Sequence, residues 1–178
     1  MKGIIFNLLE EAVRNDFGED AWDALIEASG SSGVYTSLGT YPDQELLAFV
    51  SAASKLLGKS IDDIVKWFGV SAVPLLHARL PELFRRYQST RSFLLGLNDI
   101  IHPEVRKVFP GADVPDFAYD TADPKALLME YRSKRQLCAL AEGLTIGVAK
   151  HFGNHVEFQH LTCMKQGAEY CKFRITCP

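Results

Sequence analysis

Residues 127–135 read Leu-Leu-Met-Glu-Tyr-Arg-Ser-Lys-Arg and alternate between two kinds of side chain. In an extended chain, successive side chains point to opposite faces. The two faces of this strand would carry Met129, Tyr131 and Ser133 on one side and Glu130, Arg132 and Lys134 on the other. The stretch therefore predicts a β-strand over residues 127–135, with one side at least partly buried.

The chain before this strand is dominated by helical spacing of apolar residues. We expect helices at residues 3–17, 20–28, 43–58, 60–69 and 73–79, and a long helix from 89 or 90 to 108. After a short extended piece at 114–119 and the strand above, we expect a helix at 137–152 and strands at 155–161 and 170–177. Asp43 is the expected N-cap of its helix, and Gly143 and Gly147 have the spacing for close helix packing.

This order of elements predicts an α+β fold with a small antiparallel sheet. We expect a single domain over residues 1–178, because no proline-rich linker divides the chain. Within it, a helical N-terminal subdomain would cover about residues 1–60. A C-terminal subdomain with the long helix, the sheet and its helix would cover about 61–178.

The composition is that of an ordinary globular protein, since 47% of the residues are hydrophobic and 23% are charged. Lys and Arg number 19 against 22 Asp and Glu, and the net charge of −3 argues against a nucleic-acid-binding surface. No apolar run reaches the roughly 18 residues of a membrane helix. The opening residues 1–11 turn acidic without a signal-peptide cleavage site. We therefore expect a cytoplasmic protein that binds neither nucleic acid nor membranes.

His102 lies among apolar neighbours in the predicted long helix and is followed by Pro103. A lone histidine in such a place is most often a core residue bonded to a carbonyl oxygen. The alternative is a metal or haem ligand, because a neutral imidazole binds iron well. Pro103 disfavours helical geometry at the residue before it, so the helix is expected to kink or restart at His102.

Tyr131, Ser133 and Arg135 alternate and would share one face of the predicted strand. A phenol, a hydroxyl and a guanidinium on one face can bind carboxylates, and arginine can do so through two hydrogen bonds. The alternative is a solvated strand face.

All four cysteines lie in the last quarter of the chain. Without a secretory signal, such clustering argues for metal or redox chemistry. Cys138, His160, Cys163 and Cys171 together would suit a tetrahedral zinc ion, although their spacing is not that of a zinc finger. The alternative is a set of buried, inert thiols. His151, His155 and Cys177 are further candidates for the same site.

These features together resemble the bacterial haem-nitric oxide/oxygen-binding (H-NOX) domain family, which is related to the haem domain of soluble guanylate cyclase. The matching features are the opening Met1–Ile5, His102 at the position of the proximal haem ligand, the Tyr131-x-Ser133-x-Arg135 haem-propionate motif, and Pro115 at the position of a proline that packs against the porphyrin. The resemblance implies a non-covalent haem b clamped between the two subdomains. His102 would be the only protein ligand of a five-coordinate ferrous iron. It also implies that Cys138, His160, Cys163 and Cys171 form the zinc site that some members carry.

Oxygen-binding members of this family carry a distal tyrosine where this chain has Leu140. The remaining wall of the haem pocket would consist of Ile4, Ile5, Leu9, Val73 and Leu144. An apolar pocket offers no hydrogen bond to bound O₂, so we expect binding of NO and CO and exclusion of O₂. Tyr87 and Tyr119 remain possible donors.

The resemblance implies a gas sensor and no enzymatic activity. Binding of NO would release His102 from the iron and change a surface that a separate partner reads. That partner would be a histidine kinase or a cyclic-di-GMP synthase or phosphodiesterase. The alternative function is a zinc- and thiol-based redox module in which haem is secondary.

Overall fold

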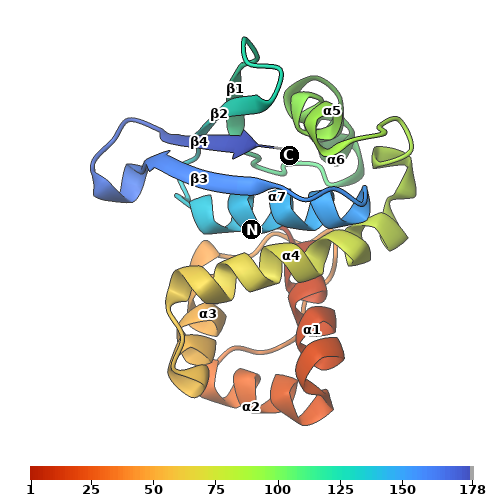
Figure 1. Cartoon of the computed structure of the whole chain (residues 1–178). Coiled ribbons are helices and arrows are strands. Elements are labelled where there is room, and N and C mark those ends of the chain that lie inside the picture. Colours follow the sequence, from red (N-terminus) through yellow and green to blue (C-terminus); the bar gives the residue numbers. More distant parts are fainter. Residues whose placement is uncertain (177–178) are drawn as a thin grey trace.

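The computed structural model describes residues 1–176, and the first half of the chain is helical (Figure 1). The four helices of this half are α1 (Gly3–Phe17), α2 (Glu19–Ser29), α3 (Asp43–Leu57) and α4 (Ile61–Arg79). They bury one shared apolar core, at whose centre Phe6 stacks on Tyr35 with 4.1 Å between the ring centroids. The expected N-terminal helices are therefore confirmed.

A broken helical segment leads from α4 to the sheet. It comprises a 3₁₀ turn (Pro81–Leu83), α5 (Thr90–Leu95), a π-helical turn (Leu97–Ile101) and α6 (His102–Val108). The capping box of Ser89 and Ser92 begins α5, because each side chain bonds the other residue's backbone amide.

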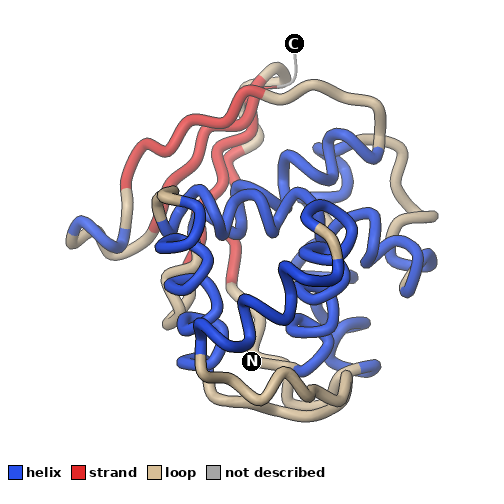
Figure 2. The backbone as a smooth tube through the Cα atoms, turned by 90° about the horizontal axis from the view of Figure 1, so that it is seen from below, coloured by secondary structure: helices blue, strands red, loops and turns tan. Residues whose placement is uncertain are grey.

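The C-terminal part forms a four-stranded antiparallel sheet in the order β1-β2-β4-β3. Its elements are β1 (Asp116–Asp120), β2 (Ala126–Arg132), α7 (Cys138–His151), β3 (Glu157–Thr162), a 3₁₀ turn (Met164–Gln166) and β4 (Cys171–Thr176). The strands gather on one side of the molecule (Figure 2). Helix α7 lies between the sheet and α4, so it joins the two parts of the molecule (Figure 1). The α+β class and the small antiparallel sheet are confirmed.

Three expected elements differ from the structure. The helices predicted at 60–69 and 73–79 are one continuous helix, α4, with Pro74 inside it. The helix predicted up to residue 108 is interrupted by the π-helical turn immediately before His102. The strand predicted to reach residue 135 ends at Arg132, so Ser133 and Arg135 lie in the turn that follows.

Helices α4 and α7 cross with their backbones in contact. A Cβ atom added to Gly143 would lie 2.2 Å from the carbonyl oxygen of Lys66 and 3.0 Å from the Cα of Gly69. At the next turn, Gly147 leaves room for the carbonyl of Val70, whose usual helical donor would be the amide that Pro74 lacks. The predicted close packing at Gly143 and Gly147 is thus confirmed. None of the helices in the described residues is long and apolar enough to cross a membrane.

We expect Gly143→Ala to lower the free energy of unfolding by about 1–3 kcal/mol, because the new methyl group must push two helix backbones apart. Urea denaturation measures this change. Lys150→Ala, on the exposed side of the same helix, is the control and should change it by less than about 0.5 kcal/mol. Equal effects of the two substitutions would contradict the role of the crossing.

Candidate functional site: a buried cavity and a thiol cluster

A cavity of about 310 Å³ lies where α1, α4, the α5–α6 segment, the sheet and α7 meet. This size falls within the range of ligand-binding pockets. Its wall is mostly apolar and includes Ile5, Val73, Leu76, Phe93, Leu97, Ile101, Val105, Leu140 and Leu144. The cavity is therefore suited to a largely hydrophobic ligand that has a few polar groups.

His102 lines this cavity and is itself buried. It is the first residue of α6, directly after the π-helical turn, so the expected irregularity at this position is found. Burial lowers the pKa of His102 to about 4, and the nearby charge of Arg106 acts in the same direction. The imidazole is thus neutral near pH 7, and its side chain has no hydrogen-bond partner within the described residues. A neutral, unpartnered imidazole in an apolar cavity has a nitrogen lone pair free to bind a metal.

Tyr131, Ser133 and Arg135 line the same cavity. The Tyr131 hydroxyl accepts a hydrogen bond from the Leu137 amide at 3.1 Å, which fixes the turn that follows β2. The Ser133 hydroxyl accepts one from the Arg135 amide at 3.2 Å. The sequence motif is therefore brought together at the cavity by a strand end and a turn, rather than by one continuous strand face.

The guanidinium of Arg135 is held by two acidic residues from other parts of the chain. Its Nε donates to Asp43 at 2.7 Å, and its Nη1 donates to the carbonyl of Asp113 at 2.7 Å. Burial acts to raise the pKa of Asp43, but the amino group of Met1 and Arg135 outweigh this effect and lower it below 3.8. Nη2 of Arg135 has no partner within the described residues, so it can donate to a carboxylate of a bound ligand.

Asp43 is a residue of the site that the sequence analysis missed. We expected an N-cap there, but Pro42 occupies that position and Asp43 lies in the first turn of α3. Its pairing with Arg135 spans 92 positions of the chain, and no local pattern signals such a contact.

Most of the apolar residues that were expected around the cavity do line it. They are Ile4, Ile5, Val73, Pro115, Leu140 and Leu144. Leu9 does not: it is buried in the helical core between α1 and its neighbours. Pro115 lies directly before β1.

The two tyrosines that were possible donors do not line the cavity. The hydroxyl of Tyr119 donates to the carbonyl of Leu94 at 2.5 Å, and burial raises its pKa. Thr145 on α7 does line the cavity, but its hydroxyl already donates to the carbonyl of Ala141 at 2.8 Å. None of these three hydroxyl groups is therefore positioned to donate to a small ligand in the cavity.

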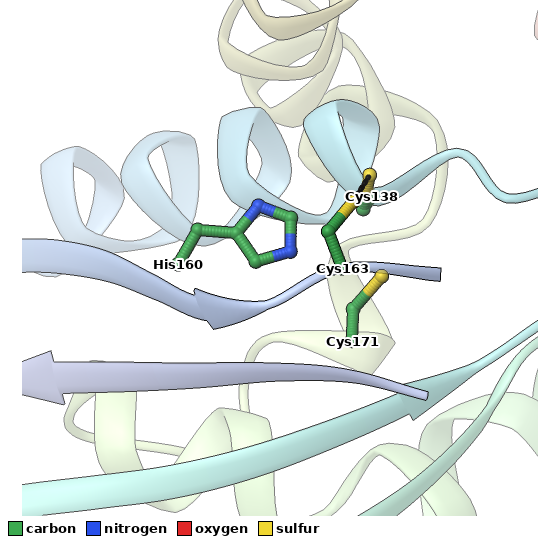
Figure 3. A group of neighbouring side chains, drawn as sticks. All are labelled: Cys138, His160, Cys163 and Cys171. Carbon is green, nitrogen blue, oxygen red and sulfur yellow. Dashed lines mark hydrogen bonds between the residues drawn. The ribbon is translucent and has the colours of Figure 1, made fainter. Parts of the chain in front are cut away.

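The second constellation is the cluster of Cys138, His160, Cys163 and Cys171 (Figure 3). Cys138 begins α7, and the other three come from the ends of β3 and β4 and the segment between them. Their ligand atoms all lie within 4.8 Å of one another. His151 is instead packed against His77, with 4.5 Å between the ring centroids. Cys177 lies outside the described residues.

The donor set of this cluster fits a zinc ion. The sulfur atoms of Cys138 and Cys163 are 3.9 Å apart. Two thiolates on one tetrahedral zinc, with bonds of about 2.3 Å, are separated by about 3.8 Å. Burial, with Cys171 nearby, raises the pKa of Cys138 to about 12. The thiolate form of Cys138 therefore needs a cation beside it, and a metal ion would supply one.

Comparison with known proteins shows the same family along nearly the whole chain. The model of the haem-NO-binding family matches residues 2–160. An H-NOX protein from S. oneidensis, solved in its Fe(II)NO ligation state, is 34% identical and has a TM-score of 0.94, with 100% of this chain and 99% of that one covered. An unliganded Fe(II) H-NOX protein from K. algicida is 29% identical, with a TM-score of 0.85 and 100% and 97% covered. An oxygen-binding H-NOX domain related to soluble guanylate cyclases is 25% identical, with a TM-score of 0.83 and 99% and 95% covered.

The ion pair between Asp43 and Arg135 should be measurable as an energetic coupling. A double-mutant cycle with Asp43→Asn and Arg135→Gln is expected to give about 0.5–1 kcal/mol at pH 7, since the pair is partly exposed. Because the pKa of Asp43 is lowered in the folded protein, this coupling should decline as the pH falls below 3.8. The exposed pair Glu104–Lys107 is the control, with less than about 0.5 kcal/mol. A coupling no larger than the control would contradict the assignment.

Proposed function

Since this chain belongs to the haem-NO-binding (H-NOX) family, a family of haem-based gas sensors, we propose that it senses nitric oxide through a ferrous haem held by His102. The observation that carries the proposal is the neutral, unpartnered imidazole of His102 in an apolar cavity. When bound, the haem supplies a ferrous iron with one face open to a diatomic gas.

The residues of the cavity fit a non-covalent haem b. His102 would hold the iron, and Tyr131, Ser133 and Arg135 would hold the propionates, as their positions along the cavity allow. The sequence contains no C-x-x-C-H motif for covalent attachment. Pro115 and the apolar residues of the wall would contact the porphyrin.

The apolar wall of the cavity supports selectivity for NO and CO over O₂. Bound O₂ gains from a hydrogen-bond donor in a dry pocket, and Leu140 and Leu144 offer none. The fold itself does not decide this property, because the similar structures include an H-NOX domain that binds oxygen. We therefore assign the exclusion of O₂ to the side chains of the cavity wall, with Leu140 at the decisive position.

We infer that the signal is the movement of His102 away from its iron-bound position when NO binds. The helix that carries His102 and the turn that carries Arg135 line the same cavity and would both hold the haem, so release of His102 would free one from the other. A binding event shifts this equilibrium only as far as its affinity differs between the two states. The protein that responds to this conformational change would be a separate cytoplasmic partner, either a histidine kinase or a cyclic-di-GMP synthase or phosphodiesterase. In this role the protein is a receiver and not an enzyme.

Absorption spectra of the haem-loaded, reduced protein test the ligand selectivity. We expect a five-coordinate ferrous spectrum, conversion by NO to a five-coordinate nitrosyl spectrum, and no stable oxygen complex in air. Leu140→Tyr places a hydroxyl donor on the distal wall and should permit an oxygen complex, whereas Leu140→Phe, its control of similar size, should not. A stable oxygen complex in the wild-type protein would contradict the proposal.

His102→Gly tests the assignment of the iron ligand. The variant should lose the normal ferrous spectrum and recover it when free imidazole is added, because the small ligand can occupy the space left by the side chain. His155→Gly, at an exposed position in a loop, is the control and should behave as the wild type. A normal spectrum for the His102 variant without imidazole would favour the zinc- and thiol-based redox module, in which haem is secondary.

We also propose that Cys138, His160, Cys163 and Cys171 bind one zinc ion, on the evidence of their mutual distances. The ion would stabilise the ends of β3 and β4 against the start of α7. This arrangement also leaves open a response to oxidation, since zinc-bound thiolates can be oxidised.

The zinc proposal predicts one zinc per chain in protein purified without chelators, measured by elemental analysis. His160→Ala should lower the affinity for zinc at least tenfold in a chelator competition, because one of four ligands is lost. His155→Ala is the matched control and should leave the affinity unchanged. The redox module predicts instead that peroxide changes the protein through these cysteines whether or not haem is bound.

A further inference from the structure

The outer edge of strand β1 is covered at one point by the side chain of Asn98. Strand β1 is an edge strand, paired only with β2, and its outer backbone groups need partners. At Phe117, both groups bond to Asn98. The Asn98 Nδ2 donates to the Phe117 carbonyl at 2.5 Å, and the Phe117 amide donates to the Asn98 Oδ1 at 3.2 Å. The Asn98 side chain therefore makes the two hydrogen bonds that a residue of a neighbouring strand would make with Phe117.

Asn98 lies in the π-helical turn that precedes His102. In this turn the amide of Ile101 bonds to the carbonyl of Gly96 at 3.0 Å, five residues back. Such turns contain one residue more than an α-helical turn and occur mainly at functional sites. The position of His102 relative to the sheet thus depends on how this turn is attached to β1.

The side chain of Phe117 packs near both His102 and Tyr131, which are proposed to hold the iron and a propionate of the haem. Its ring centroid lies 5.8 Å from that of His102 and 5.8 Å from that of Tyr131. A second attachment lies two residues further along β1, where Tyr119 donates to the carbonyl of Leu94. The bond at Phe117 attaches β1 to the turn that leads directly into His102, and the bond at Tyr119 attaches β1 to α5 before that turn. A displacement of His102 and its turn therefore acts on β1 first at Phe117.

We propose that Asn98 is a positioning residue that sets the place of His102 against the sheet and transmits its displacement to β1. This inference rests on the proposed function for the part that concerns NO. The choice of asparagine follows from its chemistry: a carboxamide has one acceptor and a donor group in one plane, which match the carbonyl and amide of one residue. Alanine provides neither, and aspartate provides only the acceptor.

Hydrogen exchange of the haem-free protein tests the attachment alone. Asn98→Ala should speed exchange at the Phe117 amide by roughly threefold to tenfold, because that amide loses its hydrogen bond to the Asn98 side chain. Asn7→Ala is the matched control, since Asn7 also donates to a backbone carbonyl, that of Tyr35 at 3.0 Å, but lies on α1. It should leave Phe117 unchanged. Equal exchange in Asn98→Ala and the wild type would overturn the attachment.

The haem-loaded protein tests the transmission. Resonance Raman spectroscopy of the ferrous Asn98→Ala variant should show a shifted or broadened iron–histidine stretching band, while Asn7→Ala keeps the wild-type band. On addition of NO, exchange at Phe117 and Tyr119 should rise at least threefold in the wild type and less than twofold in Asn98→Ala. A wild-type band together with a wild-type rise in exchange would overturn the proposal.

Asn98→Asp serves where the alanine variant does not fold. It keeps the acceptor for the Phe117 amide but sets a carboxylate against the Phe117 carbonyl, so the same band shift and the same loss of the NO-dependent rise are expected. Asn7→Asp makes the matched change on α1, where Asn7 also accepts a hydrogen bond from Ser37. Failure of the proposed NO-sensing function can be told apart from failure of the Asn98 proposal. In the first case NO would leave the absorption spectrum of the wild-type protein unchanged.

Discussion

The direct contact between the backbones of α4 and α7 is the constraint on which the rest of the structure depends. Two glycines, Gly69 and Gly143, allow the helices to meet without side chains between them. Helix α7 can then face α4 on one side and the sheet on the other, as Figure 1 shows. The two parts of the chain are thereby joined at the crossing, and the cavity opens beside it, because both helices turn apolar side chains such as Val73 and Leu144 toward it.

The cavity combines an apolar wall with polar groups in a few defined places. A protonated His102 would carry an uncompensated charge into an apolar environment, which is why burial lowers its pKa. Arg135 keeps its charge at the rim of the same cavity because Asp43 and Asp113 accept its hydrogen bonds. The site thus offers a neutral nitrogen ligand inside and a cationic donor at the rim, a distribution suited to a hydrophobic macrocycle with carboxylate groups.

None of the four residues of the cysteine cluster lines this cavity, and the cluster has a different structural role. The segment between β3 and β4 contains only a short 3₁₀ turn, and none of its residues is fully buried. Ligand atoms from α7, β3 and β4 within 4.8 Å of one another allow one ion to hold these ends together. In small substructures with little apolar surface, a metal ion can supply stability that packing does not.

The sequence by itself determined the α+β class and the helical first half of the chain, because these follow from the local spacing of apolar and polar side chains. His102, Tyr131, Ser133 and Arg135 could be selected as candidates for the same reason, and the four zinc-ligand candidates from their residue types. The continuity of α4 through Pro74 could not be predicted, since packing against α7 overrides the local preference at that position.

Only the tertiary structure decided the contacts between distant parts of the chain. Asp43 holds Arg135 across 92 positions, and Asn98 covers the outer edge of β1, 19 positions away. Leu9 and Leu140 have the same apolar character in the sequence, yet Leu9 enters the helical core and Leu140 lines the cavity. The physical reason is common to all three cases: hydrogen-bond partners and the side of a helix that faces a cavity are set by how the elements pack, and local sequence contains no information on that packing.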